Sequence, residues 1–177
     1  MSQDSAAHLL LDLRTGREAA QVARQIIVAN AAIRSEVTRL LAGSVIPADH
    51  ELARWLLRVE TDALIAAGSG ESESLYTLVA LVARFADPRD ALLLWRARQA
   101  TTETRAGVDV EQMARLDLDG VRRYLGQLHD ANGSEAGEAA AALAWLNEGE
   151  RDGAFADLAG YFAWSDERFG ITVSGPT

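Results

Sequence analysis

The chain has 177 residues, 49% of them hydrophobic and 24% charged, which is enough for one folded domain with a sizeable core and excludes disorder over its whole length. Its 26 acidic residues outnumber the 17 basic ones, and the resulting net charge of −9 repels phosphate backbones and anionic lipid headgroups. We therefore expect neither a nucleic acid nor a membrane as a partner.

Two residue types that carry much of enzyme chemistry are missing from the sequence. Every basic residue is arginine, so the chain has no lysine, and it also has no cysteine. These absences exclude lysine Schiff bases, a phosphate-loop lysine, disulfides, thiolate metal sites and cysteine nucleophiles. We accordingly expect no cofactor.

The N-terminal segment lacks the pattern of a secretion signal. It begins with the acidic Asp4 and carries only a short apolar run from Leu9 to Leu11, where a signal peptide has a basic region followed by a longer apolar one. No segment approaches the roughly 18 consecutive apolar residues of a membrane span. We expect a cytoplasmic protein whose ends, residues 1–5 and 170–177, are irregular.

Apolar residues three and four positions apart predict a long first helix over residues 16–42. On its buried face we place, in chain order, Val22, Ile26, the small Ala29, Ile33, Val37 and Leu40. Asn30 lies beside this face, at its boundary with solvent. Gly43 follows as the C-terminal stop of the helix.

Two later helices begin with the same short motif. Pro47-x-Asp49 precedes a helix that carries Trp55, and Pro88-x-Asp90 precedes one that carries Trp95. The two motifs are about 40 residues apart, a spacing within the range of HEAT-type repeats. The position of the tryptophan slips by one residue between the two copies, so the internal similarity is weak.

Further apolar stripes predict helices as far as the C-terminal region, and the last of these helices carries Phe155, Leu158 and Phe162. No segment alternates apolar and polar residues with β-branched enrichment, so we expect no sheet. The predicted fold class is all-α, a single domain of seven or eight helices over residues 1–177. Its arrangement is either a helical bundle or a short HEAT-like stack of antiparallel helix pairs.

Charge concentrates where one predicted helix gives way to a polar loop near residue 100. Arg98 and Arg105 are seven residues apart, so a continuing helix would place both guanidinium groups on one face. Together with Arg96 and Asp109 they form a candidate binding site for a carboxylate or a phosphate. The alternative is structural, because arginines near a helix C-terminus complement its dipole and Glu103 and Asp109 can pair with them.

Aromatic residues gather near the C-terminus of a chain in which they make up only 6% of the sequence. Helical spacing places Tyr161 and Trp164 on a different side from the apolar face of the last helix, and exposed Tyr and Trp side chains commonly anchor protein interfaces. Tyr161, Trp164 and Phe169 are therefore the candidate interface residues. The alternative is that the tail at residues 171–173 covers them.

Recognisable catalytic and metal-binding motifs are absent from the sequence. The three histidines, His8, His50 and His129, lie far apart, and none belongs to a Glu-x-x-His or His-Glu-x-x-His pattern. Several pairs of carboxylates stand two residues apart, a spacing that points them to different sides of a helix. We expect no metal site and favour a protein without enzymatic activity, although residues distant in sequence can still meet in the fold.

Three functional hypotheses follow. The leading one is a protein interaction module of adaptor or immunity type, whose acidic surface would favour a basic partner. The alternative is the binding of a small anionic ligand, or an enzymatic activity, in a polar pocket around Arg98, Arg105 and Asp109. The third is a purely structural or oligomer-forming role, for which the helix predicted over residues 16–42 would provide a two-fold packing face.

Overall fold

Prolines, glycines and capping side chains divide the chain into many short helices. The computed structural model describes residues 3–16 and 19–173, and these form eleven α-helices and two 3-10 helices without any β-strand. The elements are α1 (Gln3–Thr15), α2 (Ala19–Ala29), α3 (Ala31–Ala42), η1 (Pro47–Asp49), α4 (His50–Ala67), α5 (Glu73–Arg84), η2 (Pro88–Asp90), α6 (Ala91–Arg98), α7 (Thr102–Gly107), α8 (Glu111–Ala114), α9 (Leu118–Asp130), α10 (Ala136–Arg151) and α11 (Leu158–Arg168). The predicted all-α class is confirmed, and the number of α-helices in the described residues is above the seven or eight expected.

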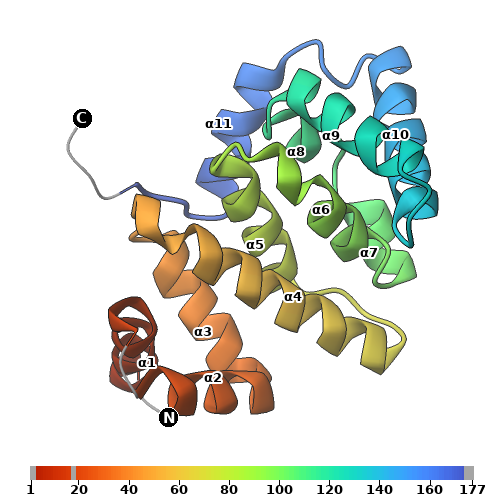
Figure 1. Ribbon diagram of the computed structural model, residues 1–177. Coiled ribbons are helices and arrows are strands. Elements are labelled where there is room, and N and C mark those ends of the chain that lie inside the picture. Colours follow the sequence, from red (N-terminus) through yellow and green to blue (C-terminus); the bar gives the residue numbers. More distant parts are fainter. Residues whose placement is uncertain (1–2, 17–18, 174–177) are drawn as a thin grey trace.

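The helices follow one another in space much as they do along the chain (Figure 1). α1, α2 and α3 form one end of the molecule, the α4–α5 pair occupies the middle, and α6 to α10 form the other end. α11 returns to pack beside α8 and close to α5. This order brings the loop at residues 108–110 against the C-terminal helix.

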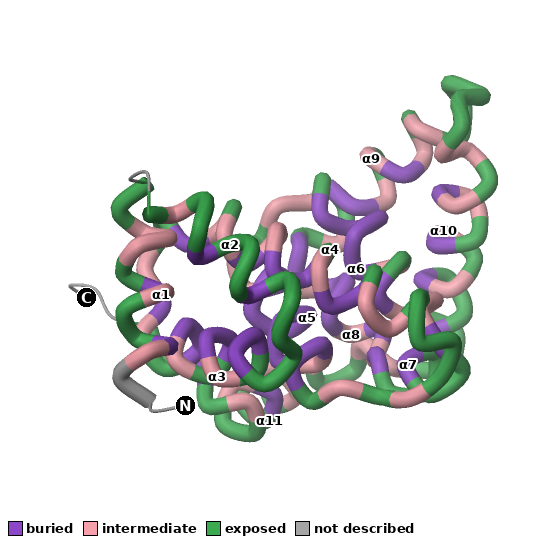
Figure 2. Tube along the Cα trace, turned by 90° about the horizontal axis from the view of Figure 1, so that it is seen from below, coloured by how far each residue is buried: buried purple, intermediate pink, exposed green. Residues whose placement is uncertain are grey.

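The core is centred on α5, whose sequence is apolar nearly all the way round. Nine of its twelve residues are buried, including Leu78, Leu81 and Val82, because α3, α4, α6 and α8 surround it. Figure 2 shows the purple of buried residues concentrated in the middle of the molecule, with exposed surface along the outer helices. A helix that is hydrophobic on all sides is stable only in such a central position.

The single long helix predicted over residues 16–42 is wrong, because the chain breaks at Asn30. Asn30 is extended, with φ −135° and ψ 106°, and its side chain accepts a hydrogen bond from the backbone N–H of Ile33 at 3.1 Å, which caps the start of α3. Arg34 secures the break by donating to the last carbonyls of α2, those of Ile27 and Val28, and by pairing with Glu60. Asparagine satisfies a helix start better than a helix interior, so the boundary forms there.

The break also changes which side of α2 is buried. Val22 and Ile26, both predicted to be buried, are 57% and 38% exposed, and Ala23 and Ile27 face the core instead. The predicted face continues correctly only beyond Asn30, where Ile33 and Val37 are buried. Apolar periodicity carries no information about the change of direction at a helix break.

The two ends of the chain also differ in part from the expectation. Gln3 to Ser5, within the segment predicted to be irregular, already belong to α1, because Ala6 and Leu10 one turn apart anchor this helix in the core. Residues 1, 2 and 174–177 lie outside the described residues. Near the other end, the backbone of Thr172 donates to Ala42 O at 2.8 Å and accepts from Val45 N–H at 2.9 Å. The last described residues are thus fastened beside the connection between α3 and α4.

Candidate functional site

The structure does not bring together in one site all four residues that were predicted to form a polar binding site. Arg96 lies on the outer side of α6 and pairs with two carboxylates of the neighbouring helix region, Glu135 and Glu138, at 2.7 Å each. Both pairs are close to half exposed, so each contributes little to stability. Arg96 therefore links α6 to the start of α10.

Arg98 lies in the angle between two indole rings. Its guanidinium carbon is 5.5 Å from the ring centre of Trp95 and 4.5 Å from that of Trp145. Trp95 is only half-buried, and it packs against Trp145 rather than deep in the core. Arg105 is exposed, and neither it nor Arg98 makes an ion pair within the described residues.

Asp109 forms no ion pair with the predicted arginine site in the described residues and lies against a predicted interface residue, Tyr161, instead. The hydroxyl of Tyr161 in α11 donates a hydrogen bond to Asp109 Oδ2 at 2.9 Å. Burial raises the pKa of the Tyr161 hydroxyl far above its ordinary value, and the negative charge of Asp109 raises it further. The phenol consequently stays protonated and acts as a fixed donor to the carboxylate.

A buried amide holds the other side of Tyr161 in place. Gln112, only 3% exposed, donates from Nε2 to Ser165 Oγ at 2.8 Å and to the Tyr161 hydroxyl at 3.1 Å. Its Oε1 is buried and has no hydrogen-bond partner among the described residues. Gln112 also lines a small hollow of about 20 Å³, together with Asp109, Tyr161 and Phe169. An unpaired acceptor is thus present where α8 meets α11.

Trp164 is the exposed member of this group. Its ring lies 5.6 Å from that of Tyr161, centre to centre, and half of the residue's surface is exposed. Phe169 is half-buried against the core and is not available as a contact of similar size. Of the three predicted interface residues, Trp164 therefore offers the largest free apolar surface.

Glu111 belongs to this site, although the sequence analysis did not single it out. Burial raises its pKa, and the neighbouring negative charge of Asp109 raises it as well. Neither carboxylate has an arginine partner in the part of the chain that the structure describes. The signal was the pair Asp109-x-Glu111: Asp109 precedes α8 and Glu111 begins it, so the rule that separates residues two positions apart within a helix does not apply to them. We call Asp109, Glu111, Tyr161 and Trp164 the acidic–aromatic surface.

The opposite side of α11 has a different electrostatic character. Asp166 accepts two hydrogen bonds from Arg115 at 2.8 Å each and also pairs with Arg84, which ties α11 to α5 and to the end of α8. The guanidinium of Arg115 lies 5.0 Å from the ring centre of Phe162. Charges on this side are compensated within the protein, whereas those of the acidic–aromatic surface are not.

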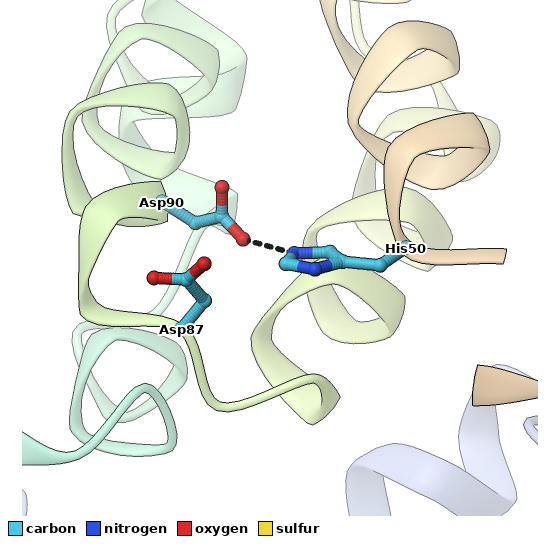
Figure 3. A group of neighbouring side chains, drawn as sticks. All are labelled: His50, Asp87 and Asp90. Carbon is cyan, nitrogen blue, oxygen red and sulfur yellow. Dashed lines mark hydrogen bonds and ion pairs between the residues drawn. The ribbon is translucent and has the colours of Figure 1, made fainter. Parts of the chain in front are cut away.

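A second polar cluster, also missed in the sequence, lies where α4 and α6 begin (Figure 3). His50 Nε2 is 2.6 Å from Asp90 Oδ2, and Asp87 completes a group whose possible ligand atoms all lie within 4.8 Å of one another. The imidazole ring also stacks on Phe85, with 4.7 Å between ring centres. His50 directly follows the first Pro-x-Asp segment and Asp90 ends the second, and the sequence analysis related these segments only by their similarity.

The chemistry of this cluster does not suit a metal ion. Arg54 Nε is 2.7 Å from Asp90 Oδ1, and Arg89 donates to both oxygens of Asp87. A cation would have to displace these guanidinium groups and also break the contact between His50 and Asp90. The side chains instead join the starts of two helices, so we assign the cluster to the structure of the fold.

Comparison with known proteins adds no functional information. No family model matches this chain, and neither a curated protein nor a solved structure matches it. Among the described helices, none is long and apolar enough to cross a membrane. The functional argument therefore rests on the side chains of the acidic–aromatic surface.

Proposed function

We propose that the protein is an interaction module that binds a basic segment of a partner protein at the acidic–aromatic surface. The observation that carries this proposal is the position of Asp109 and Glu111, two carboxylates without arginine partners among the described residues, beside Tyr161, whose ring lies 5.6 Å from the half-exposed ring of Trp164. Nine of the arginines in the described residues already pair with carboxylates elsewhere: Arg14, Arg34, Arg39, Arg54, Arg84, Arg89, Arg96, Arg115 and Arg122.

An arginine or lysine side chain of the partner fits this chemistry. Its alkyl part and cationic head can lie on the Trp164 ring, an interaction worth about 0.5–2 kcal/mol depending on how far water is excluded. The same cation can pair with Asp109 or Glu111, which removes the repulsion between the two carboxylates. Tyr161 holds Asp109 in place before binding, so less conformational freedom is lost on association.

The overall charge supports a basic partner for a second reason. A net charge of −9 attracts cationic proteins over distances longer than a side chain and raises the rate of encounter at low salt. Trp164 then supplies the apolar anchor that charge alone does not provide. We therefore expect complex formation to weaken as the salt concentration rises.

The test compares tagged variants as baits in lysate of the organism that encodes the protein. Trp164→Ala and the double variant Asp109→Asn, Glu111→Gln remove the anchor and the charges in turn. Ile65→Ala is the matched control, because Ile65 is an equally exposed apolar residue at the far end of α4. We expect a basic protein to be captured by the unmodified chain and by Ile65→Ala, and to be lost with the other two variants.

Two results would overturn the proposal. One is equal capture of the same proteins by all four baits, which would place the contact elsewhere. The other is the absence of any specifically captured protein at good bait expression. Far-UV circular dichroism of each bait, with unchanged helix content, ensures that a loss of capture reports on the surface and not on folding.

A further inference from the structure

Arg98 and Arg105 form a second site, on a face of the molecule built by α6, α7 and α10. Both arginines lack a carboxylate partner in the described ranges 3–16 and 19–173, although the chain is strongly acidic. Arg98 ends α6, and Arg105 lies in α7, the short helix that follows it (Figure 1). Arg96 and Asp109, which the sequence placed with them, are engaged elsewhere.

The guanidinium of Arg98 is held in a fixed orientation before any ligand binds. It packs on the faces of Trp95 and Trp145, whose ring centres are 5.7 Å apart and whose planes are tilted by 49°. Aromatic faces hold a guanidinium without using its N–H donors. The Nε donor is buried and has no hydrogen-bond partner among the described residues, so part of the group's hydrogen-bonding capacity is unused.

The backbone keeps Arg105 close to Arg98. Thr101 caps α7 by accepting a hydrogen bond from the backbone N–H of Thr104 at 3.1 Å, and the hydroxyl of Thr104 donates to the backbone carbonyl of Arg98 at 3.1 Å. Arg105 is the next residue along the chain. Burial lowers the pKa of Arg98, and the positive charge of Arg105 lowers it further, as expected for two nearby cations that are not neutralised.

We propose that Arg98 and Arg105 bind a small phosphate-type dianion between their guanidinium groups. Two guanidinium groups match two negative charges, and the planar fork of N–H donors on each group suits the oxygens of a phosphate. This site goes beyond the proposed protein contact, because it involves different residues and the opposite charge. Its occupant is a small molecule or ion.

Glu148 on α10 is the main competitor for these cations. Its negative charge offsets part of the lowering of the Arg98 pKa, but it makes no ion pair with either arginine in the described structure. One carboxylate offsets one of the two positive charges. A singly charged ligand such as acetate should therefore bind less tightly than a dianion. This difference in charge is the basis for discriminating the ligand class.

The four tryptophans of the chain provide a direct readout. Inorganic phosphate is added to ¹⁵N-labelled protein at pH 7.5 and constant ionic strength, and the indole N–H signals are followed by NMR. We expect the signals of Trp95 and Trp145 to shift in a saturable manner, because these rings contact Arg98, while those of Trp55 and Trp164 stay in place. Acetate serves as the singly charged comparison.

Variants test whether Arg98 and Arg105 are the residues that bind phosphate. Arg105→Gln changes an exposed side chain and should leave the fold intact, while Arg98→Lys keeps a positive charge near the indoles but removes the fork of donors. Each is expected to raise the dissociation constant for phosphate about tenfold, the loss expected for one charge-assisted hydrogen bond. The matched control is Arg123→Gln, which removes another exposed arginine without an ion pair in the described structure and should bind as the unmodified chain does.

Shifts that do not saturate, equal binding by Arg105→Gln and Arg123→Gln, or equal affinity for acetate and phosphate would each overturn the proposal. The outcome is independent of the acidic–aromatic surface. Trp164→Ala should bind phosphate normally, and Arg105→Gln should capture the partner protein normally.

Discussion

The two Pro-x-Asp segments have the same sequence pattern and the same position at a helix start, yet their aspartates make different contacts. Asp49 closes η1 before α4, and Asp90 closes η2 before α6. Both are essentially unexposed, at 1% and 0%. Each forms an ion pair with an arginine from an earlier part of the chain, Arg14 or Arg54, so the weak internal similarity in the sequence corresponds to a similar junction in space.

The contacts of Asp49 are well aligned. Arg14 donates to Asp49 Oδ1 at 2.9 Å and to Oδ2 at 2.7 Å, and Oδ2 also accepts the backbone N–H of Ile46 at 2.9 Å. Asp90 has two cationic or potentially cationic neighbours, His50 and Arg54, but the N–H of Arg54 is not directed at Asp90 Oδ1 and forms no hydrogen bond with it.

Burial consequently raises the pKa of Asp90, and the contacts with His50 and Arg54 lower it only in part. The comparison teaches that the direction of the donors, and not the number of charged neighbours, decides how well a buried carboxylate is compensated. Free energies of unfolding can test this conclusion in three ways.

The largest effect is expected at the first junction. Asp49→Asn removes the charge that receives two guanidinium hydrogen bonds and places an amide N–H₂ group against Arg14. We expect the free energy of unfolding in urea to fall by about 2–3 kcal/mol. The double variant with Arg14→Gln should lose less than the sum of the two single changes, and strict additivity would contradict the direct coupling.

At the second junction, Asp90→Asn should cost about 1 kcal/mol or less at pH 7, because it also removes the penalty for burying an imperfectly compensated charge. The pKa of Asp90 is raised in the folded state, so in the unmodified chain this group reduces stability as the pH rises above about 4. The difference between the unmodified chain and Asp90→Asn should therefore shrink from pH 4 to pH 7. A cost equal to that of Asp49→Asn at pH 7 would refute the comparison.

The smallest effect concerns Asp87, which has no counterpart at the first junction, where Ile46 stands. Arg89 lowers the pKa of Asp87 to about 2, through side-chain and backbone hydrogen bonds, so the stability from this group is present above about pH 4 and is lost as the pH falls towards 2. The free energy of unfolding of Asp87→Asn should therefore fall less between pH 4 and pH 2 than that of the unmodified chain. Because Arg89 is largely exposed, we expect less than about 1 kcal/mol, and an unchanged acid limb would contradict the assignment.

Local sequence patterns predicted what depends on local structure. The all-α class follows from the apolar periodicity, and the two helix starts follow from the Pro-x-Asp motifs. Helical spacing placed Trp164 away from the apolar face of the last helix. The break at Asn30 was missed because the apolar pattern runs on through it, and only the capping geometry and Arg34 fix the boundary.

The candidate site depended on contacts between distant parts of the chain. Asp109 and Tyr161 are joined by a hydrogen bond although 52 positions separate them, and no spacing rule connects them. The same holds for His50 and Asp90, which are 40 positions apart. Sequence reasoning found Asp109, Tyr161 and Trp164 separately, and it missed Glu111 because the path of the loop before α8 decides where that side chain lies.

The fastening of Thr172 to Ala42 and Val45 has a consequence for how the molecule unfolds. In an array in which each helix touches mainly its neighbours, the ends can fray while the middle stays folded. Here the last described segment is hydrogen-bonded to the first third of the chain, so the C-terminal end cannot detach without disturbing the α3–α4 connection. This long-range closure favours a single cooperative transition, and it slows folding because distant segments must meet before it forms.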